Sequence, residues 1–285
     1  MIQRWIDSYR PNNLEASEQA LREIMQIITL SGLYKAGFFK VAAFYGGTAL
    51  RLFYGLNRFS EDLDFSLLEK DKDFSLNSYL NHIVDEFGTF GIKIQLKEKK
   101  NRSRKSKFDS AFLKSDTIWN ELIFESANFQ INSGNKPSIK IKIEVDTQPP
   151  LGFTTEQRLL LNPYSFYVNC FTIDNLFAGK MHALLFRKWL NRVKGRDWYD
   201  LEWYIKNGYE LNSGHFCIRA NESKDWSKPT ITKDELYALF QKKLKEVNME
   251  KVKDDIKRFI PDDGVLAIWS EGYFKDLFQQ IKFKA

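Results

Sequence analysis

Two short stretches decide how this chain is expected to fold: GGTALRL at 46–52 and RFSEDLD at 58–64. The apolar run Val41–Tyr45 leads into the first stretch and predicts a buried strand that stops at the paired glycines. Thr48 can cap the short helix expected after them. Apolar and polar residues alternate over Asp62–Leu67, which predicts a strand with one polar face.

This combination indicates phosphate and metal chemistry. Glycine lets the backbone approach a phosphate closely, and a helix N-terminus offers free N–H groups and a positive dipole end. The turn Gly46-Gly47-Thr48 is therefore a candidate phosphate-binding segment. Asp62 and Asp64 share one strand face and could bind divalent cations together. Mg²⁺ suits such a pair, because it is commonly held by one or two carboxylates plus substrate phosphates; Mn²⁺ is the alternative.

Each half of the pattern has an ordinary explanation as well. Most Gly-Gly pairs are simple turns, and most Asp-x-Asp strands are solvated faces. The catalytic interpretation rests on their combination at this spacing, with each half in a suitable structural context.

The segment Gly46–Asp64 resembles the first motif of nucleotidyltransferases of the DNA polymerase β superfamily, in the form found in the AbiEii/AbiGii toxin family. The resemblance implies that Gly46, Gly47 and Thr48 hold the triphosphate of an NTP. It implies that Asp62 and Asp64 bind metal. Arg58 and Ser60 also fit the pattern and are expected to support the loop.

The resemblance further implies a third carboxylate on a neighbouring strand. The run Ile139–Asp146 alternates apolar and polar residues and predicts such a strand. Asp146 is the candidate metal ligand, and Glu144 on the same face is its rival. Both could instead be solvent-facing acids beside Lys140 and Lys142.

A second resemblance lies further along the chain. A helix carrying Lys180 is followed by the segment Arg196-Asp197-x-x-Asp200-Leu201, and the toxin family has a similar pair. Lys180 and Asp200 are candidate catalytic residues, with Lys180 also a candidate phosphate ligand. Alternatively, Arg196 and Asp200 could form an i,i+4 ion pair, and Asp197 could cap its helix. The role of Arg187, on the face of Lys180, stays open.

The overall pattern predicts an α+β protein. A polymerase-β-like mixed sheet with helices is expected over residues 1–160, and a helical C-terminal domain over 161–285. Outside the motifs, the expected elements of the first part are helices near 17–30, ended by Gly32, and 76–87, with strands near 92–96 and 118–124. Those of the second part are helices near 174–193, 196–206, 233–247 and 265–282, with Thr232 and Glu235 as a capping box.

Composition sets broad limits on function. Hydrophobic residues make up 43% of the 285 residues, which is enough for a substantial core. The net charge of +6 permits binding of RNA or an NTP without requiring it. The two cysteines and three histidines have no disulfide or zinc spacing. The sequence shows neither a signal peptide nor an apolar run of roughly 20 residues. We therefore expect no association with a membrane and a location in the cytoplasm.

Two further features have a functional and an ordinary interpretation. The run Lys97–Lys107 carries seven basic residues and could contact an RNA backbone, although such runs are usually solvated loops. The aromatic residues Trp198, Tyr199, Trp203 and Tyr204 follow helical spacing, which favours core packing over base stacking.

The expected reaction is attack of an acceptor hydroxyl on the α-phosphorus of an NTP, with release of pyrophosphate. The resemblance suggests the 3′ end of a tRNA, or another RNA, as acceptor, growth arrest as the outcome, and a cognate antitoxin as partner. A protein or small-molecule acceptor is the first alternative. A nucleotide-binding module without turnover is the second.

Overall fold

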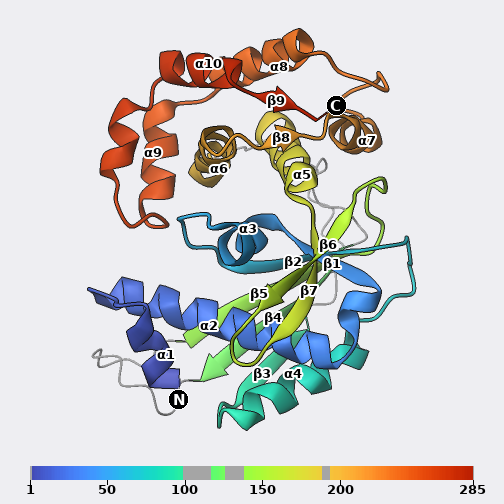
Figure 1. Ribbon diagram of the computed structural model, residues 1–285, viewed down its shortest axis with the longest axis vertical. Helices are drawn as coiled ribbons and strands as arrows, with labels where there is room; N and C mark the ends of the chain where they lie inside the picture. Colours follow the sequence, from blue (N-terminus) through green and yellow to red (C-terminus); the bar gives the residue numbers. More distant parts are fainter. Residues whose placement is uncertain (1, 99–116, 126–137, 188–192, 285) are drawn as a thin grey trace.

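A mixed sheet organises the N-terminal part of the chain (Figure 1). The computed structural model describes residues 2–98, 117–125, 138–187 and 193–284. Within them, seven strands pair in the order β3-β4-β5-β2-β1-β7-β6. Their bounds are β1 Ala42–Tyr45, β2 Asp62–Leu67, β3 Ile94–Glu98, β4 Thr117–Glu125, β5 Ser138–Asp146, β6 Thr155–Leu160 and β7 Phe166–Phe171. The pairs β2–β5 and β1–β7 are parallel and the others antiparallel, which confirms the mixed sheet.

One face of the sheet is covered by α2 (Leu14–Lys35), which in turn packs on α4 (Asn77–Thr89), with α1 (Ile2–Ser8) at one end (Figure 1). Asn13 begins α2, since its side chain accepts a hydrogen bond from the backbone N–H of Ala16. The prediction that Gly32 ends this helix is wrong. Gly32 instead lies at the contact with α4, where a β-carbon would come within 2.8 Å of the Ile83 Cα.

The C-terminal part is mainly helical, as expected. Its helices are α5 Ile173–Phe186, α6 Gly195–Lys206, α7 Ser213–Glu222, α8 Lys233–Glu246, α9 Met249–Lys257 and α10 Glu271–Gln279. The capping box of Thr232 and Glu235 is confirmed at the start of α8. Short elements complete the fold: η1 Phe38–Lys40, η2 Gly264–Ile268, and the paired strands β8 Glu210–Leu211 and β9 Lys282–Phe283.

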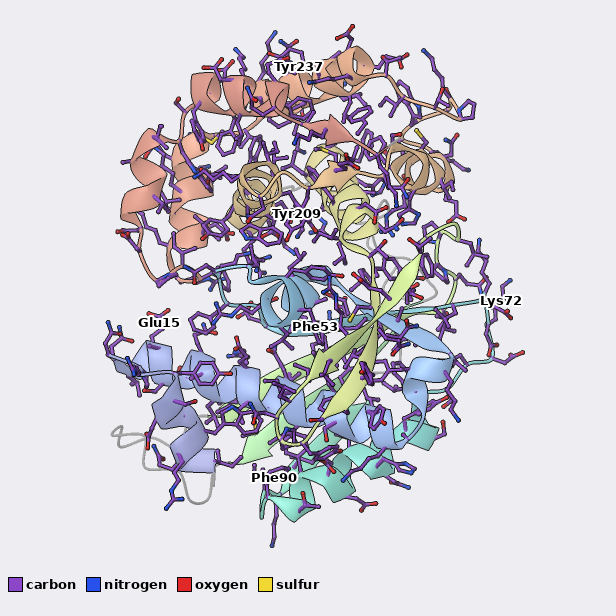
Figure 2. All side chains as sticks on the ribbon, in the orientation of Figure 1. Glu15, Phe53, Lys72, Phe90, Tyr209 and Tyr237 are labelled. Atoms are coloured by element: carbon purple, nitrogen blue, oxygen red, sulfur yellow. The ribbon has the colours of Figure 1, made fainter. Side chains whose placement is uncertain are left out.

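Two hydrophobic cores meet at β1 and α3 (Gly46–Tyr54). The first fills the space between the sheet and the helices α2 and α4. The second fills the helical part and includes Ala43, Leu50 and Phe171 from the sheet side. Figure 2 shows side chains filling both layers, with Phe53 of α3 packed on Phe44 of β1 at a centroid distance of 6.3 Å. The site carried by β1, α3 and β2 therefore lies where the two parts join.

The hairpin β6–β7 was not predicted, and it extends the sheet to Phe171. The expected division between residues 160 and 161 falls inside this hairpin. We now propose the boundary just after β7, before α5 begins at Ile173. In the part of the chain that the structure describes, every helix is too short or too polar to cross a membrane.

Candidate active site

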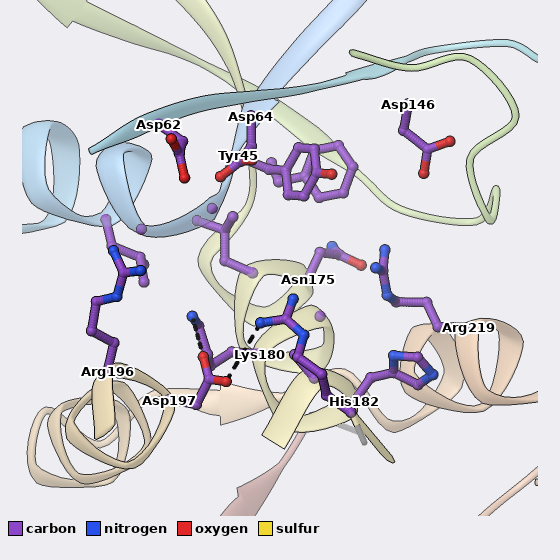
Figure 3. Close-up of a pocket in the computed structure, with 18 of the residues that line it drawn as sticks. Tyr45, Asp62, Asp64, Asp146, Asn175, Lys180, His182, Arg196, Asp197 and Arg219 are labelled. Atoms are coloured by element: carbon purple, nitrogen blue, oxygen red, sulfur yellow. Dashed lines mark hydrogen bonds and ion pairs between the residues drawn. The ribbon is translucent and has the colours of Figure 1, made fainter. Parts of the chain in front are cut away.

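A pocket of about 790 Å³ opens between the sheet and the helices α5, α6 and α7 (Figure 3). The β1–α3 turn, β2 and β5 form one wall, and the three helices form the other. The polar side chains that line it are Tyr45, Arg58, Ser60, Asp62, Asp64, Lys142, Glu144, Asp146, Asn175, Lys180, His182, Arg187, Lys194, Arg196, Asp197, Arg219, Glu222, Ser223 and Lys224. The pocket thus contains most of the predicted site residues.

Side chains pack so closely on Gly46 and Gly47 that neither position has room for a β-carbon. Gly46 has a φ of 85°, and a β-carbon there would lie 2.3 Å from Oδ2 of Asp64. A β-carbon on Gly47 would lie 2.8 Å from Nη2 of Arg58. The glycine turn and the later Arg58–Asp64 segment are therefore built against each other, and both glycines line the pocket.

Thr48 does not cap the helix, contrary to the prediction. Tyr45 is the N-cap residue, and the helix already begins at Gly46. The Thr48 side chain is fully buried, and its Oγ1 donates a hydrogen bond to the Asp62 carbonyl at 2.5 Å. Thr48 is not among the pocket-lining residues. Thr48 therefore holds the start of β2 through this hydrogen bond and does not face the pocket.

Asp62 and Asp64 lie on the pocket face of β2, as predicted. The parallel register sets Asp64 beside Glu144 and Asp62 beside Lys142, with Glu144 ion-paired to Lys142. Enclosure in the pocket raises the pKa of Asp64 to about 8, and the charges of Glu144 and Asp62 contribute to the rise. The pKa of Asp62 is raised by the same causes, enclosure first and then Glu144.

The predicted metal trio of Asp62, Asp64 and Asp146 is not brought together. Among the described residues, no three His, Cys, Asp or Glu side chains are grouped so that they could hold a metal ion. The register explains this, because Asp146 lies beside Ser66, one strand repeat beyond Glu144. Asp146 lines the pocket further along, where Figure 3 shows it well apart from Asp62.

A divalent cation nevertheless fits the pair on β2. Two enclosed carboxylates, with Glu144 beside them, carry negative charge that raises the pKa of Asp64. A hard cation with oxygen preference would neutralise that charge. Two carboxylates alone make an incomplete coordination shell, and the phosphate oxygens of a nucleotide are the usual completion.

Lys180 projects from α5 across the pocket from these carboxylates. Its Nζ lies 3.0 Å from Oδ1 of Asp197 and 2.8 Å from Oδ2 of Asp200. Burial alone would raise the pKa of Asp197, but Lys180, Arg187 and Lys194 outweigh burial and lower it. Asp197 thus stays ionised and holds Lys180 in place.

Asp200 is fully buried and does not line the pocket. Its carboxylate receives two hydrogen bonds of 2.6 Å from Nε and Nη2 of Arg58, whose side chain is 2% exposed. The alternative i,i+4 pair with Arg196 is not formed, because Arg196 binds Glu61 at 3.3 Å. Asp200 acts on the site through Arg58 and Lys180, which makes it a positioning residue.

The loop that carries the aspartates is fastened to the helical part at further points. The backbone N–H of Phe59 donates to the Phe259 carbonyl at 2.8 Å, and the Tyr199 hydroxyl donates to the Asn57 carbonyl at 3.0 Å. With the Arg58–Asp200 pair, these contacts confirm the expectation that Arg58 supports the loop. Ser60 lines the pocket, and its carbonyl accepts a hydrogen bond from Gln26 of α2 at 3.0 Å.

Lys194 was not predicted as a site residue. It lies in the pocket wall near Lys180, Arg187 and Arg196. Burial lowers the pKa of Lys194 to about 8, and the nearby charges of Arg187, Arg196 and Lys180 contribute. We call these four residues the basic wall. Two sequence signals pointed toward it: the helical spacing from Lys180 to Arg187, and the Arg196-Asp197-x-x-Asp200-Leu201 segment.

Two other interpretations have different outcomes. The run Lys97–Lys107 lies almost wholly outside the described residues, so its expected RNA contact stays a prediction. Trp198 and Tyr204 are buried in the second core, and Tyr199 and Trp203 pack against it, which confirms their structural role.

Comparison with known proteins identifies a family and similar folds. The family model described as nucleotidyl transferase AbiEii toxin, type IV toxin–antitoxin system, matches residues 28–279. No curated protein matches the sequence. Among solved structures, MenT4, a nucleotidyltransferase toxin from Mycobacterium tuberculosis, is similar with a TM-score of 0.61 and 15% identity, over 98% of this chain and 89% of that one. JHP933 from Helicobacter pylori is similar with a TM-score of 0.48 and 18% identity, over 92% of this chain and 88% of that one.

Proposed function

This protein belongs to the AbiEii family of nucleotidyl transferase toxins, since that family's model covers most of the chain, and we propose that it transfers an NMP from an Mg²⁺-bound NTP to a hydroxyl of RNA. The observation that supports the proposal most is the opposition of two charged walls across one pocket. Asp62, Asp64 and Glu144 lie on the sheet side, and the basic wall lies on the helical side.

The two walls match the two charged parts of a metal–nucleotide complex. Asp62 and Asp64 would hold Mg²⁺ or Mn²⁺, which would neutralise charge on the leaving pyrophosphate. Lys180, Lys194 and Arg196 would bind the triphosphate oxygens, together with the backbone N–H groups at the Gly46-Gly47 turn. We propose that Asp62 and Asp64 hold the metal without a third carboxylate, and that Glu144, which the strand register sets beside Asp64, adds negative charge to this wall.

In the proposed reaction, the acceptor oxygen forms a bond to the α-phosphorus while the bond to the pyrophosphate oxygen breaks. The proton of the hydroxyl passes to a carboxylate of this site or to water. The basic wall stabilises the charge that builds on the leaving group. Asp197 and Asp200 hold Lys180 in position for this, at 3.0 and 2.8 Å.

The acceptor and the biological setting are proposed more broadly. We propose an RNA acceptor, with the 3′ end of a tRNA as the first to test, in the cytoplasm, where NTPs and tRNA are both present. The family description places such toxins in type IV toxin–antitoxin systems, so a cognate antitoxin is the proposed protein partner.

The test combines purified protein, Mg²⁺, each α-³²P-labelled NTP in turn, and total cellular RNA. We expect label on a small RNA, and we expect Asp64→Asn to abolish it, because the amide removes a metal ligand. Asp254→Asn is the matched control, since its side chain on α9 is 70% exposed and forms an exposed ion pair with nearby Lys257.

Each other outcome contradicts a defined part of the proposal. Label on protein or on a small molecule would replace the RNA acceptor but keep the reaction. Nucleotide transfer that persists in EDTA would show that the reaction does not need a divalent metal ion. Absence of label with all four NTPs, while a labelled NTP still binds, would favour the binding module without turnover.

A further inference from the structure

The pocket extends beyond the charged walls toward Tyr45 and Arg219 (Figure 3). Figure 3 shows the Tyr45 ring between Asp64 and Asp146, and Arg219 below Asp146. Burial raises the pKa of Tyr45, Asp64 and Asp146 raise it further, and Arg219 opposes them. These influences agree with a position of the Tyr45 hydroxyl near Asp64, with Asp146 and Arg219 also nearby.

Aromatic rings reach the pocket at this end. Tyr45 stacks on Phe171 with a centroid distance of 5.3 Å, and Phe171 stacks on Phe153 at 4.0 Å. Tyr45 and Phe171 both line the pocket, but Phe171 is 2% exposed, so it supports the half-buried Tyr45 ring from behind and Tyr45 presents the aromatic surface. Such a surface suits a planar, neutral group, because bases stack favourably on aromatic side chains whatever their identity. The charged triphosphate is better placed against the basic wall.

Arg219 offers hydrogen bonds that the protein does not use. Its Nε is buried, and it finds no hydrogen-bond partner among the described residues. A buried donor without a partner is costly, which makes it a strong site for an acceptor on a ligand. Its guanidinium lies over α5 at Gly179, where a β-carbon would be 3.8 Å from Cζ. The flat guanidinium thus lies close to α5, at a distance where an added β-carbon would make ordinary van der Waals contact with it.

We infer that Tyr45, Phe171 and Arg219 form the nucleobase subsite of this pocket, with Arg219 donating to acceptor atoms on the edge of the base. The inference rests on the proposed nucleotidyltransferase function. The order along the pocket then follows the order of groups in an NTP. The triphosphate lies at the basic wall, the α-phosphate at Asp62 and Asp64, and the base against Tyr45 and Arg219, with the sugar between the aspartates and the base.

The test compares ligands with and without a base. The α,β-methylene analogues of ATP, CTP, GTP and UTP cannot transfer their nucleotide, and inorganic tripolyphosphate lacks sugar and base altogether. Calorimetry with Mg²⁺ would measure the binding of each to the full chain. Arg219→Met should weaken binding of the tightest-binding analogue at least tenfold. It should also reduce the differences in affinity among the four analogues. Binding of tripolyphosphate should change less than twofold.

Arg187→Met is the comparison at the other end of the pocket. It should weaken binding of the analogues and of tripolyphosphate by similar factors, because Arg187 belongs to the basic wall. Arg219→Lys keeps the charge but not the planar fork, so it should lose base discrimination as Arg219→Met does. It also serves as the test if Arg219→Met does not fold, as judged by thermal unfolding.

Failure of this inference differs from failure of the proposed function. If Arg219→Met weakens binding of tripolyphosphate as much as binding of the analogues, Arg219 binds phosphate and the inferred base subsite is overturned. Unchanged analogue binding in both Arg219 variants overturns it as well. If the wild-type protein binds neither tripolyphosphate nor any analogue, the proposed function fails, and the inference fails with it.

Discussion

At the residue scale, Asp64 shows how a functional charge opposes stability. Its pKa of about 8 lies far above the ordinary 3.8, so the folded state holds this proton more tightly than the unfolded state does. The resulting stabilisation is complete below about pH 4 and is lost as the pH rises through 8. Without metal, the cost of enclosing Asp64 therefore grows from about pH 4, where the unfolded state begins to release this proton, and is greatest above pH 8, where folded Asp64 is ionised.

Asp64→Asn should accordingly raise the Tm of the metal-free protein. The gain should be near zero at pH 4, grow up to about pH 8 and stay constant above it, because the amide cannot ionise. A rise of about 4 pKa units corresponds to roughly 5–6 kcal/mol, and one kcal/mol to roughly 2–4 °C in a chain of about this size, so a gain on the order of 10 °C is expected above pH 8. Thermal unfolding in EDTA across this pH range would measure it. An Asp64→Asn protein less stable than wild type at pH 9 would contradict the prediction.

Gly46 illustrates a residue fixed by both backbone and neighbour. Gly46→Ala should lower activity at least tenfold, because the new β-carbon would lie 2.3 Å from Oδ2 of Asp64 and displace that carboxylate. Gly55→Ala is the matched control: Gly55 has a φ of 79°, close to the 85° of Gly46, but no atom lies within 4 Å of its added β-carbon. Both variants should lose about 1–2 kcal/mol of stability from the left-handed backbone. Equal activity in the two variants would show that the Asp64 contact is unimportant.

At the element scale, the junction of α2 and α4 depends on one missing side chain. Gly32→Ala should destabilise the protein by about 1–3 kcal/mol, because its β-carbon would lie 2.8 Å from the Cα of Ile83 and force the two helices apart. Chemical denaturation would measure the loss. Gly88→Ala on α4 meets nothing within 4 Å and should instead stabilise by about 0.5–1 kcal/mol, since alanine favours a helix. A neutral Gly32→Ala would mean that the helices can move apart freely.

Sequence patterns predicted the elements of the site better than their register. Alternation placed Glu144 and Asp146 correctly on one strand face, but both satisfy that pattern equally. Only the pairing of β5 with β2, which depends on contacts distant in sequence, sets Glu144 beside Asp64. The hairpin β6–β7 escaped prediction because β6 is an edge strand with exposed and half-buried positions and few apolar residues.

The site residues divide in the same way. Asp62, Asp64 and the two glycines belong to a local motif, and the structure brings them together in the pocket. Lys194 and Arg219 were missed, because each is an isolated basic residue in the sequence. What marks them is visible only in three dimensions: other cations lie near Lys194, and Arg219 lies against α5 with a buried Nε that has no partner within the described part of the chain.

At the scale of the whole molecule, the pocket exists because the sheet part and the helical part are held together. The pair of Arg58 and Asp200 joins the loop before β2 to α6, with both side chains buried. Lys180 of α5 binds the same carboxylate at 2.8 Å. One buried acid therefore fastens both the loop that leads to Asp62 and Asp64 on β2 and the lysine that faces them.

Asp200→Asn should cost about 3–5 kcal/mol of unfolding free energy, because it leaves the buried charge of Arg58 without its partner. Equilibrium denaturation would measure this, and Asp254→Asn, which breaks an exposed pair, should cost at most about 1 kcal/mol. The double variant Arg58→Met/Asp200→Leu removes both buried charges and should regain much of the stability. It should stay inactive, because Lys180 loses one of its two carboxylate partners and the loop loses its ionic anchor. Full activity in a stable double variant would show that packing alone positions the loop and Lys180, and that the buried pair does not contribute to the alignment of the two walls.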